Sequence, residues 1–194
     1  ARMARYVRPD ELHQSFNFHF LTTPWNAQAL STSIAESLEL AGSVGAPQTW
    51  VLSNHDVMRH ASRLGRSSAT VQVDTGGLGP NDDQPDAELG LRRARAATTV
   101  MLALPGSAYL YQGEELGLPD GVLPDDVLQD PTWERSGHTM RGRDGCRVPM
   151  TWERDAPCFG FGPGATAWLP QPDTYGALAV DQQQGELGST LELY

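Results

Sequence analysis

The order of short apolar runs and helix-like segments constrains the fold of this chain more than any other feature of its sequence. Residues 16–21 (FNFHFL) carry phenylalanines in strict alternation, which predicts a strand. Residues 49–53 and 107–112 are short apolar runs that also predict strands. Between these runs, residues 26–42 carry an apolar stripe at helical spacing, and residues 88–104 are typical of a helix with an apolar second half. The sequence therefore predicts the order strand, helix, strand, helix, strand.

Residues that start and stop helices flank both predicted helices. Asn26 can cap the first helix and Gly42 can end it. Pro105 and Gly106 end the second. Alternating strands and helices favour parallel strands joined by right-handed crossovers. The predicted class is therefore α/β, although three such strands cannot close a barrel by themselves and both faces of a parallel sheet need cover.

Two regions lack a sustained hydrophobic period. Residues 67–86 are rich in Gly, Asp, Ser and Pro and predict a surface loop. The segment after Glu115 is also dense in Pro, Gly and Asp, but it contains Trp133, Trp152 and Trp168. Long loops are usually functional or disordered, and the tryptophans argue against disorder. We expect this second segment to be ordered and to have a function.

Composition limits the possible partners and compartments. The 194 residues suit one domain, and their net charge of −10 with scattered basic residues makes nucleic acid an unexpected partner. No apolar run approaches the roughly 20 residues of a membrane helix, and residues 1–13 lack the apolar core of a secretory signal. Cys146 and Cys158 form no disulfide framework. We expect free thiols, a cytoplasmic location and no membrane partner.

Asn54, His55 and Asp56 follow the second predicted strand directly. In parallel α/β units, ligands gather beyond the carboxyl ends of the strands. A carboxylate that accepts two hydrogen bonds, beside an imidazole that donates one, suits the adjacent hydroxyls of a sugar. The alternative is that Asp56 caps the following helix and His55 is a buried imidazole. From these residues alone both interpretations stay open.

A second charged cluster lies in residues 140–152 (MRGRDGCRVPMTW). For Arg141 a solvated or self-paired loop is the preferred interpretation. For Arg143, Asp144 and Arg147, an ordered turn that points a guanidinium at an anionic partner competes with that loop. The sequence contains no Ser/His/Asp order, phosphate-binding glycine loop or metal cluster that would point to another chemistry.

Glu114 and Glu115 end the third predicted strand. Adjacent strand residues face opposite ways, so both carboxylates cannot point at one site. We expect one at the rim of the depression and the other in solvent or paired with an arginine.

Taken together, these segments resemble one known family. The chain is similar to the C-terminal half of the catalytic barrel of the α-amylase-type glycoside hydrolases (family 13), in particular the α-glucosidase and oligo-1,6-glucosidase group. The resemblance rests on residues 16–25 (FNFHFLTTPW), 49–59 (TWVLSNHDVMR), 102–119 (LALPGSAYLYQGEELGLP), 129–152 (QDPTWERSGHTMRGRDGCRVPMTW) and 167–172 (AWLPQP).

The resemblance implies a partial (β/α)8 TIM barrel. Its sixth, seventh and eighth strands would be the three predicted here, a long loop would follow the eighth, and residues 1–194 would form the C-terminal part of one catalytic domain. It also implies a retaining mechanism with two carboxylates about 5 Å apart. The family's third carboxylate, which stabilises the transition state, falls on Asp56. His55 and Arg147 would bind the oligosaccharide or α-glucoside substrate, and Arg143 is a weaker candidate.

The resemblance assigns no nucleophile and no acid/base within this chain. In the family these groups follow the fourth and fifth strands, and no strand predicted here ends in the family's Arg-x-Asp motif. Glu114 and Glu115 do not match either position. We expect no cofactor here, with calcium possible only through upstream loops. The chain alone is expected to be inactive, and to need the other half of the barrel or to self-associate.

Several activities fit this resemblance. The first is hydrolysis of terminal α-linked glucose from oligosaccharides by the parent protein. Transglucosylases, trehalose synthases and sucrose-hydrolysing enzymes share the same barrel. An alternative of another class is a non-catalytic scaffold or interaction module. Asn54, His55 and Asp56 together with Arg147 argue against a scaffold, which has no need of them.

Overall fold

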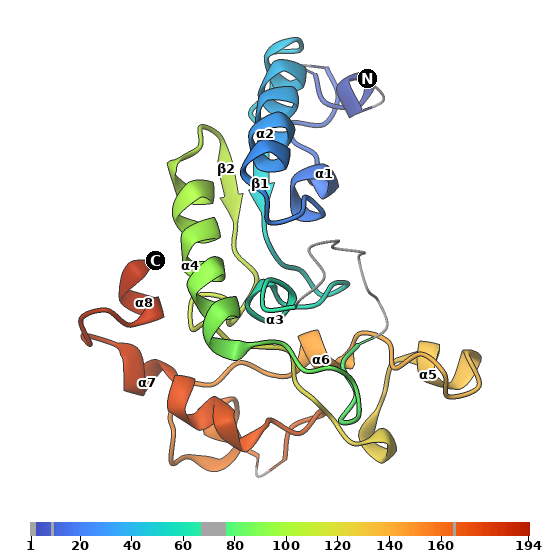
Figure 1. Cartoon of the computed structure of the whole chain (residues 1–194), viewed down its shortest axis with the longest axis vertical. Helices are drawn as coiled ribbons and strands as arrows, with labels where there is room; N and C mark the ends of the chain where they lie inside the picture. Colours follow the sequence, from blue (N-terminus) through green and yellow to red (C-terminus); the bar gives the residue numbers. More distant parts are fainter. Residues whose placement is uncertain (1–2, 9, 67–76, 165) are drawn as a thin grey trace.

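The fold contains a two-stranded parallel sheet. The computed structural model describes residues 3–8, 10–66, 77–164 and 166–194 (Figure 1). In it, β1 (Thr49–Val51) pairs in parallel with β2 (Ser107–Tyr109), in the register that sets Thr49 opposite Ser107. Two of the three expected strands are thus confirmed, and so is their parallel arrangement.

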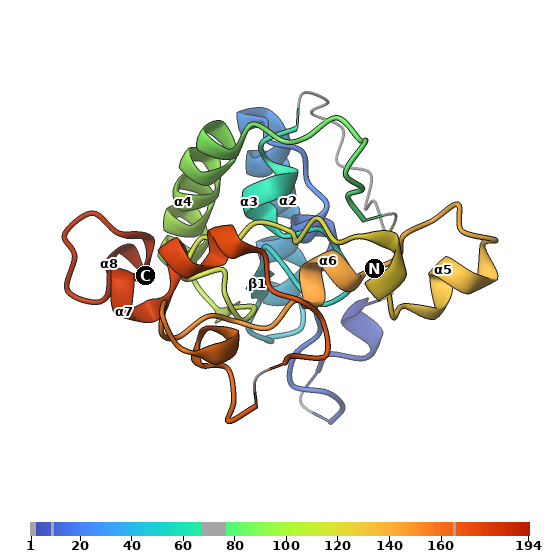
Figure 2. The same ribbon diagram turned by 90° about the horizontal axis from the view of Figure 1, so that it is seen from below.

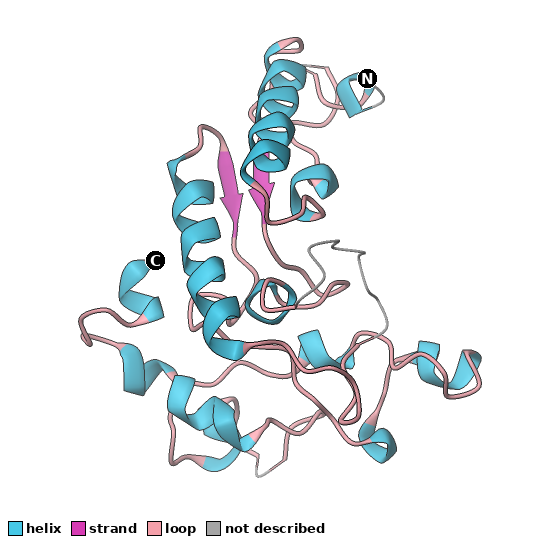
Figure 3. Cartoon of the chain, viewed as in Figure 1, coloured by secondary structure: helices cyan, strands magenta, loops and turns pink. Residues whose placement is uncertain are grey.

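Two long helices run beside this sheet (Figures 1 and 3). α2 (Ala27–Gly42) precedes β1, and the Asn26 side chain accepts a hydrogen bond from the Ala29 amide at 3.0 Å. α4 (Ala87–Ala103) precedes β2 and is capped by Asp86. Both helices confirm the sequence prediction. None of the helices in the described part of the chain has the length and apolar character to cross a membrane.

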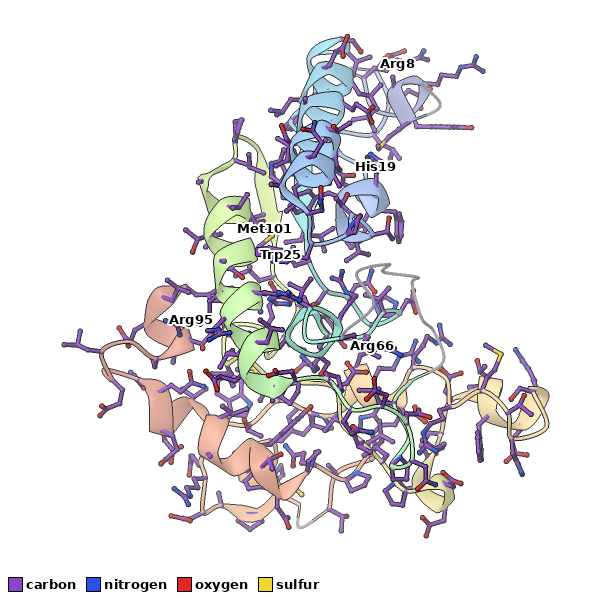
Figure 4. The ribbon with its side chains drawn as sticks, in the orientation of Figure 1. Arg8, His19, Trp25, Arg66, Arg95 and Met101 are labelled. Atoms are coloured by element: carbon purple, nitrogen blue, oxygen red, sulfur yellow. The ribbon has the colours of Figure 1, made fainter. Side chains whose placement is uncertain are left out.

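One hydrophobic core fills the space between the helices and the sheet. Met101 of α4 is fully buried there, and Trp25 packs against the same cluster from the segment that leads into α2 (Figure 4). The buried members of this core are Phe20, Trp50, Leu52, Leu64, Ala97 and Met101. Removing these apolar side chains from water is what holds α2 and α4 on the sheet.

The predicted strand at residues 16–21 is wrong. Phe18–Leu21 forms the short helix α1, and the Asn17 side chain caps it by accepting a hydrogen bond from the Phe20 amide at 3.1 Å. Burial does not follow the alternation of phenylalanines either, because Phe18 is 60% exposed while Phe20 is buried edge-on against Trp50. A local cap and the burial of Phe20 in the core beside Trp50 therefore favour the helix, whereas a strand needs a whole row of side chains on one face.

The described residues of the segment after Glu115 are packed around a core of their own, as expected for an ordered segment. Leu116, Leu118, Leu123, Val148, Met150, Leu169 and Tyr175 form that core. Short helices punctuate the chain: η1 (Met3–Arg5), α3 (His60–Arg63), η2 (Asp125–Val127), α5 (Pro131–Arg135), α6 (Asp144–Arg147), η3 (Pro157–Gly160), η4 (Asp173–Leu178), α7 (Val180–Gln183) and α8 (Thr190–Leu193). Figure 2 shows α5 extending away from the rest of the molecule. Of the loop predicted at 67–86, residues 77–86 form no helix or strand, and residues 67–76 lie outside the described residues.

Apolar side chains near the sheet remain open to solvent. Tyr109 at the end of β2 is 44% exposed, and Leu110 is 50% exposed. A parallel sheet normally has both faces covered. The sheet is therefore partly uncovered around the end of β2.

Candidate active site

The turn after β1 presents Asp56 to solvent. Within it, Asn54 Oδ1 accepts a hydrogen bond from the Asp56 amide at 2.8 Å, which fixes the turn locally. The side chains of Asp56 and His55 are 44% and 66% exposed. Helix α3 begins at His60 with Arg59 as its N-cap residue. Asp56 therefore does not cap the following helix, and His55 is not a buried imidazole.

Two arginines from the distant α6 segment converge on Asp56. Arg143 Nη1 lies 2.8 Å from Asp56 Oδ1, and Arg147 Nη2 lies 3.2 Å from the same oxygen. Arg147 Nε also donates to the His55 carbonyl at 2.8 Å. Residues four apart lie on one helical face, so a single turn of helix directs both guanidiniums at one carboxylate. The structure thus brings together Asp56, His55, Arg143 and Arg147, as the ordered-turn interpretation expected.

The charges around Asp56 keep it ionised. Partial burial by itself would raise the pKa of this carboxyl, but the hydrogen bond from Arg143 and the charges of His55, Arg143 and Arg147 outweigh it. The pKa of Asp56 therefore lies below its usual value. Two guanidiniums hold Oδ1, while Oδ2 lies 3.5 Å from His55 Nε2. The result is an exposed, oriented carboxylate that can accept hydrogen bonds from a ligand.

Sequence reasoning missed Asp130, which contacts the same cluster. Its side chain is 1% exposed, and its Oδ2 lies 2.6 Å from Arg143 Nε and 3.0 Å from the Arg143 amide. Burial acts to raise the pKa of Asp130, but hydrogen bonds from Arg143 and Thr132 prevail and hold the pKa far below its usual value. The Asp-Pro pair that starts α5 was a readable helix-start signal. It gave no sign of the contact with Arg143.

The rest of the charged segment has structural contacts. Asp144 is buried, and its Oδ2 accepts hydrogen bonds from the amides of Gln129 at 2.5 Å and Asp130 at 2.8 Å. Arg141 pairs with Asp125 of η2, and its guanidinium lies 5.7 Å from the centre of the Trp133 ring. Arg141 is thus ion-paired and not solvated, and its partner lies outside residues 140–152.

Glu114 does not lie at the rim of a site, contrary to expectation. It is 2% exposed, with Oε2 4.0 Å from His60 Nδ1 and Oε1 3.4 Å from the Tyr194 hydroxyl. The alternation of a strand had already ended at Tyr109, and a turn closed by the Glu114 amide and the Tyr111 carbonyl directs the side chain inward. Burial raises its pKa to about 8. Glu115 is half-buried.

The Arg-x-Asp spacing does occur at Arg8 and Asp10, but without the expected context. These residues follow η1 and not a strand, and their side chains pair with each other at 2.9 Å on the surface. Among the residues that the structure describes, no three His, Cys, Asp or Glu side chains are arranged to hold a metal ion.

Comparison with known proteins places this chain in a family. The model of the alpha-amylase catalytic domain matches residues 2–194. This chain belongs to the alpha-amylase family. The chain is 32% identical over 185 residues to a probable alpha-glucosidase of Rhizobium meliloti (strain 1021), covering 95% of this chain and 30% of that protein. It is 28% identical over 187 residues to Maltase A1 of Drosophila melanogaster, covering 94% and 28%.

Solved structures of family members have the same fold. The alpha-glucosyl transfer enzyme XgtA superposes with a TM-score of 0.74 at 32% identity, covering 98% of this chain and 31% of that one. A trehalulose synthase, MutB, superposes with a TM-score of 0.72, but at 20% identity it supports the fold alone. The resemblance seen in the sequence is confirmed, and the family is one of TIM barrels. This alpha-amylase family chain spans about a third of the length of these relatives.

Proposed function

We propose that this chain is the part of an α-glucosidase catalytic domain that binds the sugar ring next to the glycosidic bond to be cleaved. The parent protein would hydrolyse terminal α-linked glucose from oligosaccharides with retention. The observation that carries this proposal is the exposed Asp56 carboxylate, held by Arg143 and Arg147 beside His55 at the carboxyl end of a parallel strand. Glucosidases and a glucosyl transfer enzyme among the relatives support it.

Asp56 would stabilise the transition state through hydrogen bonds and its charge, without forming a covalent bond to the sugar. Retaining glycosidases pass through an oxocarbenium-like transition state, and hydrogen bonds to ring hydroxyls strengthen as it forms. An ionised Asp56 can accept two such bonds, and its negative charge favours the positive charge that develops on the ring. Arg143 and Arg147 hold the carboxylate in one orientation, so little reorganisation is needed during the reaction.

The other catalytic groups would come from outside these 194 residues. We place residues 1–194 in the C-terminal part of a (β/α)8 domain, with β1 and β2 as its seventh and eighth strands. The nucleophile and the acid/base would then follow earlier strands. The free thiols of Cys146 and Cys158 support a reducing, cytoplasmic setting for the enzyme.

Glucosyl transfer is the second candidate activity. The relative XgtA, at 32% identity, is an alpha-glucosyl transfer enzyme. Hydrolysis and transfer differ in whether water or another hydroxyl accepts the glucosyl group, and the same Asp56 cluster serves both. A non-catalytic scaffold is disfavoured, because it would not require a solvent-exposed carboxylate held by two arginines.

Substitution of Asp56 in the full-length enzyme tests the proposal. We expect Asp56→Asn to lower kcat on p-nitrophenyl α-glucoside, maltose and isomaltose by about 100- to 1,000-fold, the range for losing one preorganised transition-state contact. The exposed Asp155→Asn is a control with the same change of charge. Near-normal turnover by Asp56→Asn would refute the role. Product analysis with added glucose as acceptor separates transfer from hydrolysis.

A further inference from the structure

A buried carboxylate lies directly behind the proposed active-site arginines. Asp130 is almost fully enclosed, yet its Oδ2 accepts two hydrogen bonds from Arg143, one from Nε at 2.6 Å and one from the backbone amide at 3.0 Å. The other oxygen, Oδ1, accepts from the Thr132 amide at 2.9 Å. Both oxygens of Asp130 are therefore held, and neither is free to contact a substrate.

The contacts continue on both sides of Asp130 and form a chain that ends at Asp56. On the buried side, Asp144 Oδ2 accepts hydrogen bonds from the amides of Gln129 and Asp130 and fixes the backbone that carries the carboxylate. On the exposed side, the same Arg143 side chain donates from Nη1 to Asp56 Oδ1 at 2.8 Å. A planar guanidinium cannot rotate about one contact without losing the other.

Gly142 lets the two segments approach closely enough for this contact. Its φ is +77°, a backbone conformation that glycine adopts without strain, and a Cβ at this position would lie 2.7 Å from the Asp130 side chain. The neighbouring Arg143 amide can therefore reach Asp130. The close approach is built into the backbone at this point, and the ion pair does not depend on long, flexible side chains alone.

We infer that Asp130 is a positioning residue for catalysis, which acts through Arg143 to hold Asp56 in its working orientation. This inference rests on the proposed function of Asp56. Asp130 carries a full negative charge in a dry environment, where a charge-assisted hydrogen bond is both short and directional. It fixes the Nε edge of Arg143, so that the Nη1 amino group is left for Asp56. Removing that charge would leave Arg143 free to turn away from Asp56.

The main variant is Asp130→Asn in the full-length enzyme. Asparagine caps helices as well as aspartate does, so the hydrogen bond that starts α5 is kept, while the charge and the two hydrogen bonds that Oδ2 accepts from Arg143 are lost. We expect kcat to fall by about 10- to 100-fold, the range seen when outer partners that orient metal ligands are removed. KM should change far less, because the affected contact belongs to the transition state. Asp125→Asn is the matched control, since Asp125 pairs with Arg141 in the same loop and does not contact Asp56.

A double-mutant cycle with Arg143→Ala shows whether Asp130 acts through that arginine. In the Arg143→Ala background, adding Asp130→Asn should lower kcat little further, because the only other link from Asp130 to this cluster among the described residues is its 4.0 Å contact with Arg147 Nη1. A purely structural role would instead make the two losses multiply and would lower the melting temperature of Asp130→Asn in proportion. Multiplying losses would overturn the inference.

Asp56→Asn, measured in parallel, separates this inference from the proposed function. If Asp56→Asn is inactive while Asp130→Asn keeps normal kcat, the positioning role fails and the proposed function stands. If Asp56→Asn is active, the proposed function itself fails. If Asp130→Asn does not fold, Asp130→Ser is measured in its place, because serine also keeps a capping oxygen. If neither variant folds, the role of the Asp130 carboxylate is in stability, and the inference is overturned.

Discussion

Glu114 makes the stability of this protein depend on pH in a way that a single substitution should remove. The side chain is buried between His60 and Tyr194, and burial raises its pKa from 4.5 to about 8. A carboxyl with a raised folded-state pKa contributes stability that is fully present below its unfolded pKa. That stability is lost as the pH rises through the folded pKa. The window for Glu114 therefore runs from about pH 4.5 to about pH 8.

The size of the effect follows from the width of this window. Each pH unit between the two pKa values corresponds to about 1.4 kcal/mol. At pH 7, which is 7 − 4.5 = 2.5 pH units above the lower limit, ionisation of Glu114 lowers the free energy of unfolding by about 3 kcal/mol relative to its value below pH 4.5. Above pH 8 this decrease levels off at about 5 kcal/mol.

Glu114→Gln mimics the neutral carboxyl and should abolish this cost. We expect the variant to equal the wild type in free energy of unfolding near pH 4.5 and to exceed it progressively up to pH 8. His60, with its pKa lowered to about 3, and Asp120, with its pKa raised to about 6, also make the free energy of unfolding depend on pH in part of this range. They are present in both proteins, so their contributions cancel in the difference to first order.

Urea unfolding of the full-length protein at half-unit steps from pH 4.5 to pH 8.5 measures that difference. Glu88→Gln is the control, because the Glu88 side chain on α4 is 85% exposed and pairs with Arg92 at the surface. A difference between Glu114→Gln and wild type that stays constant with pH, or that shrinks as the pH rises, would refute the reasoning.

Three further predictions concern the isolated chain and two local contacts. A polypeptide of only these 194 residues should release no p-nitrophenol from an α-glucoside. It should also self-associate in sedimentation, because the apolar side chains of Tyr109 and Leu110 are exposed beside the sheet. Measurable turnover would contradict the first expectation, and a clean monomer would contradict the second. Gly142→Ala should lower the free energy of unfolding by more than about 1 kcal/mol and reduce kcat, because the Cβ would press on Asp130; an unchanged melting temperature would argue against that strain. Asn26→Ala should cost about 1 kcal/mol through loss of the α2 cap, while Asn26→Ser should be nearly neutral; equal melting temperatures for the two variants would exclude capping as the cause.

Local patterns predicted the long helices α2 and α4, but they predicted a strand where the short helix α1 forms. α2 and α4 have caps, lengths and apolar stripes that lie within their own segments, so the sequence records them fully. At residues 16–21 the alternating phenylalanines predicted a strand, whereas the structure forms a helix that Asn17 caps. Packing of Phe20 against Trp50, a contact across the fold, accompanies the helix. Such a contact leaves no trace in a local pattern.

The candidate site divides in the same way. The position of Asp56 at the end of an apolar strand is enough to mark it as a candidate site residue. Its partners are harder to rank from the sequence, and Arg143, the weaker candidate by resemblance, makes the shorter contact with Asp56, 2.8 Å against 3.2 Å for Arg147. Asp130 was missed, because its partner Arg143 lies in a different segment of an irregular loop.

The sequence by itself determined the α/β class, the two long helices, the parallel strands and membership of the alpha-amylase family. These features depend on spacing and on residue types within one segment or motif, which the order of residues contains directly. Only the tertiary structure decided that Arg143 and Arg147 converge on Asp56, that Asp130 holds Arg143, and that Glu114 turns inward. Asp56 and Arg143 are 87 residues apart, and the path of the chain between them is set by the packing of two separate cores. Contacts across such a distance follow from the packed fold as a whole, because no local spacing rule relates the residues that make them.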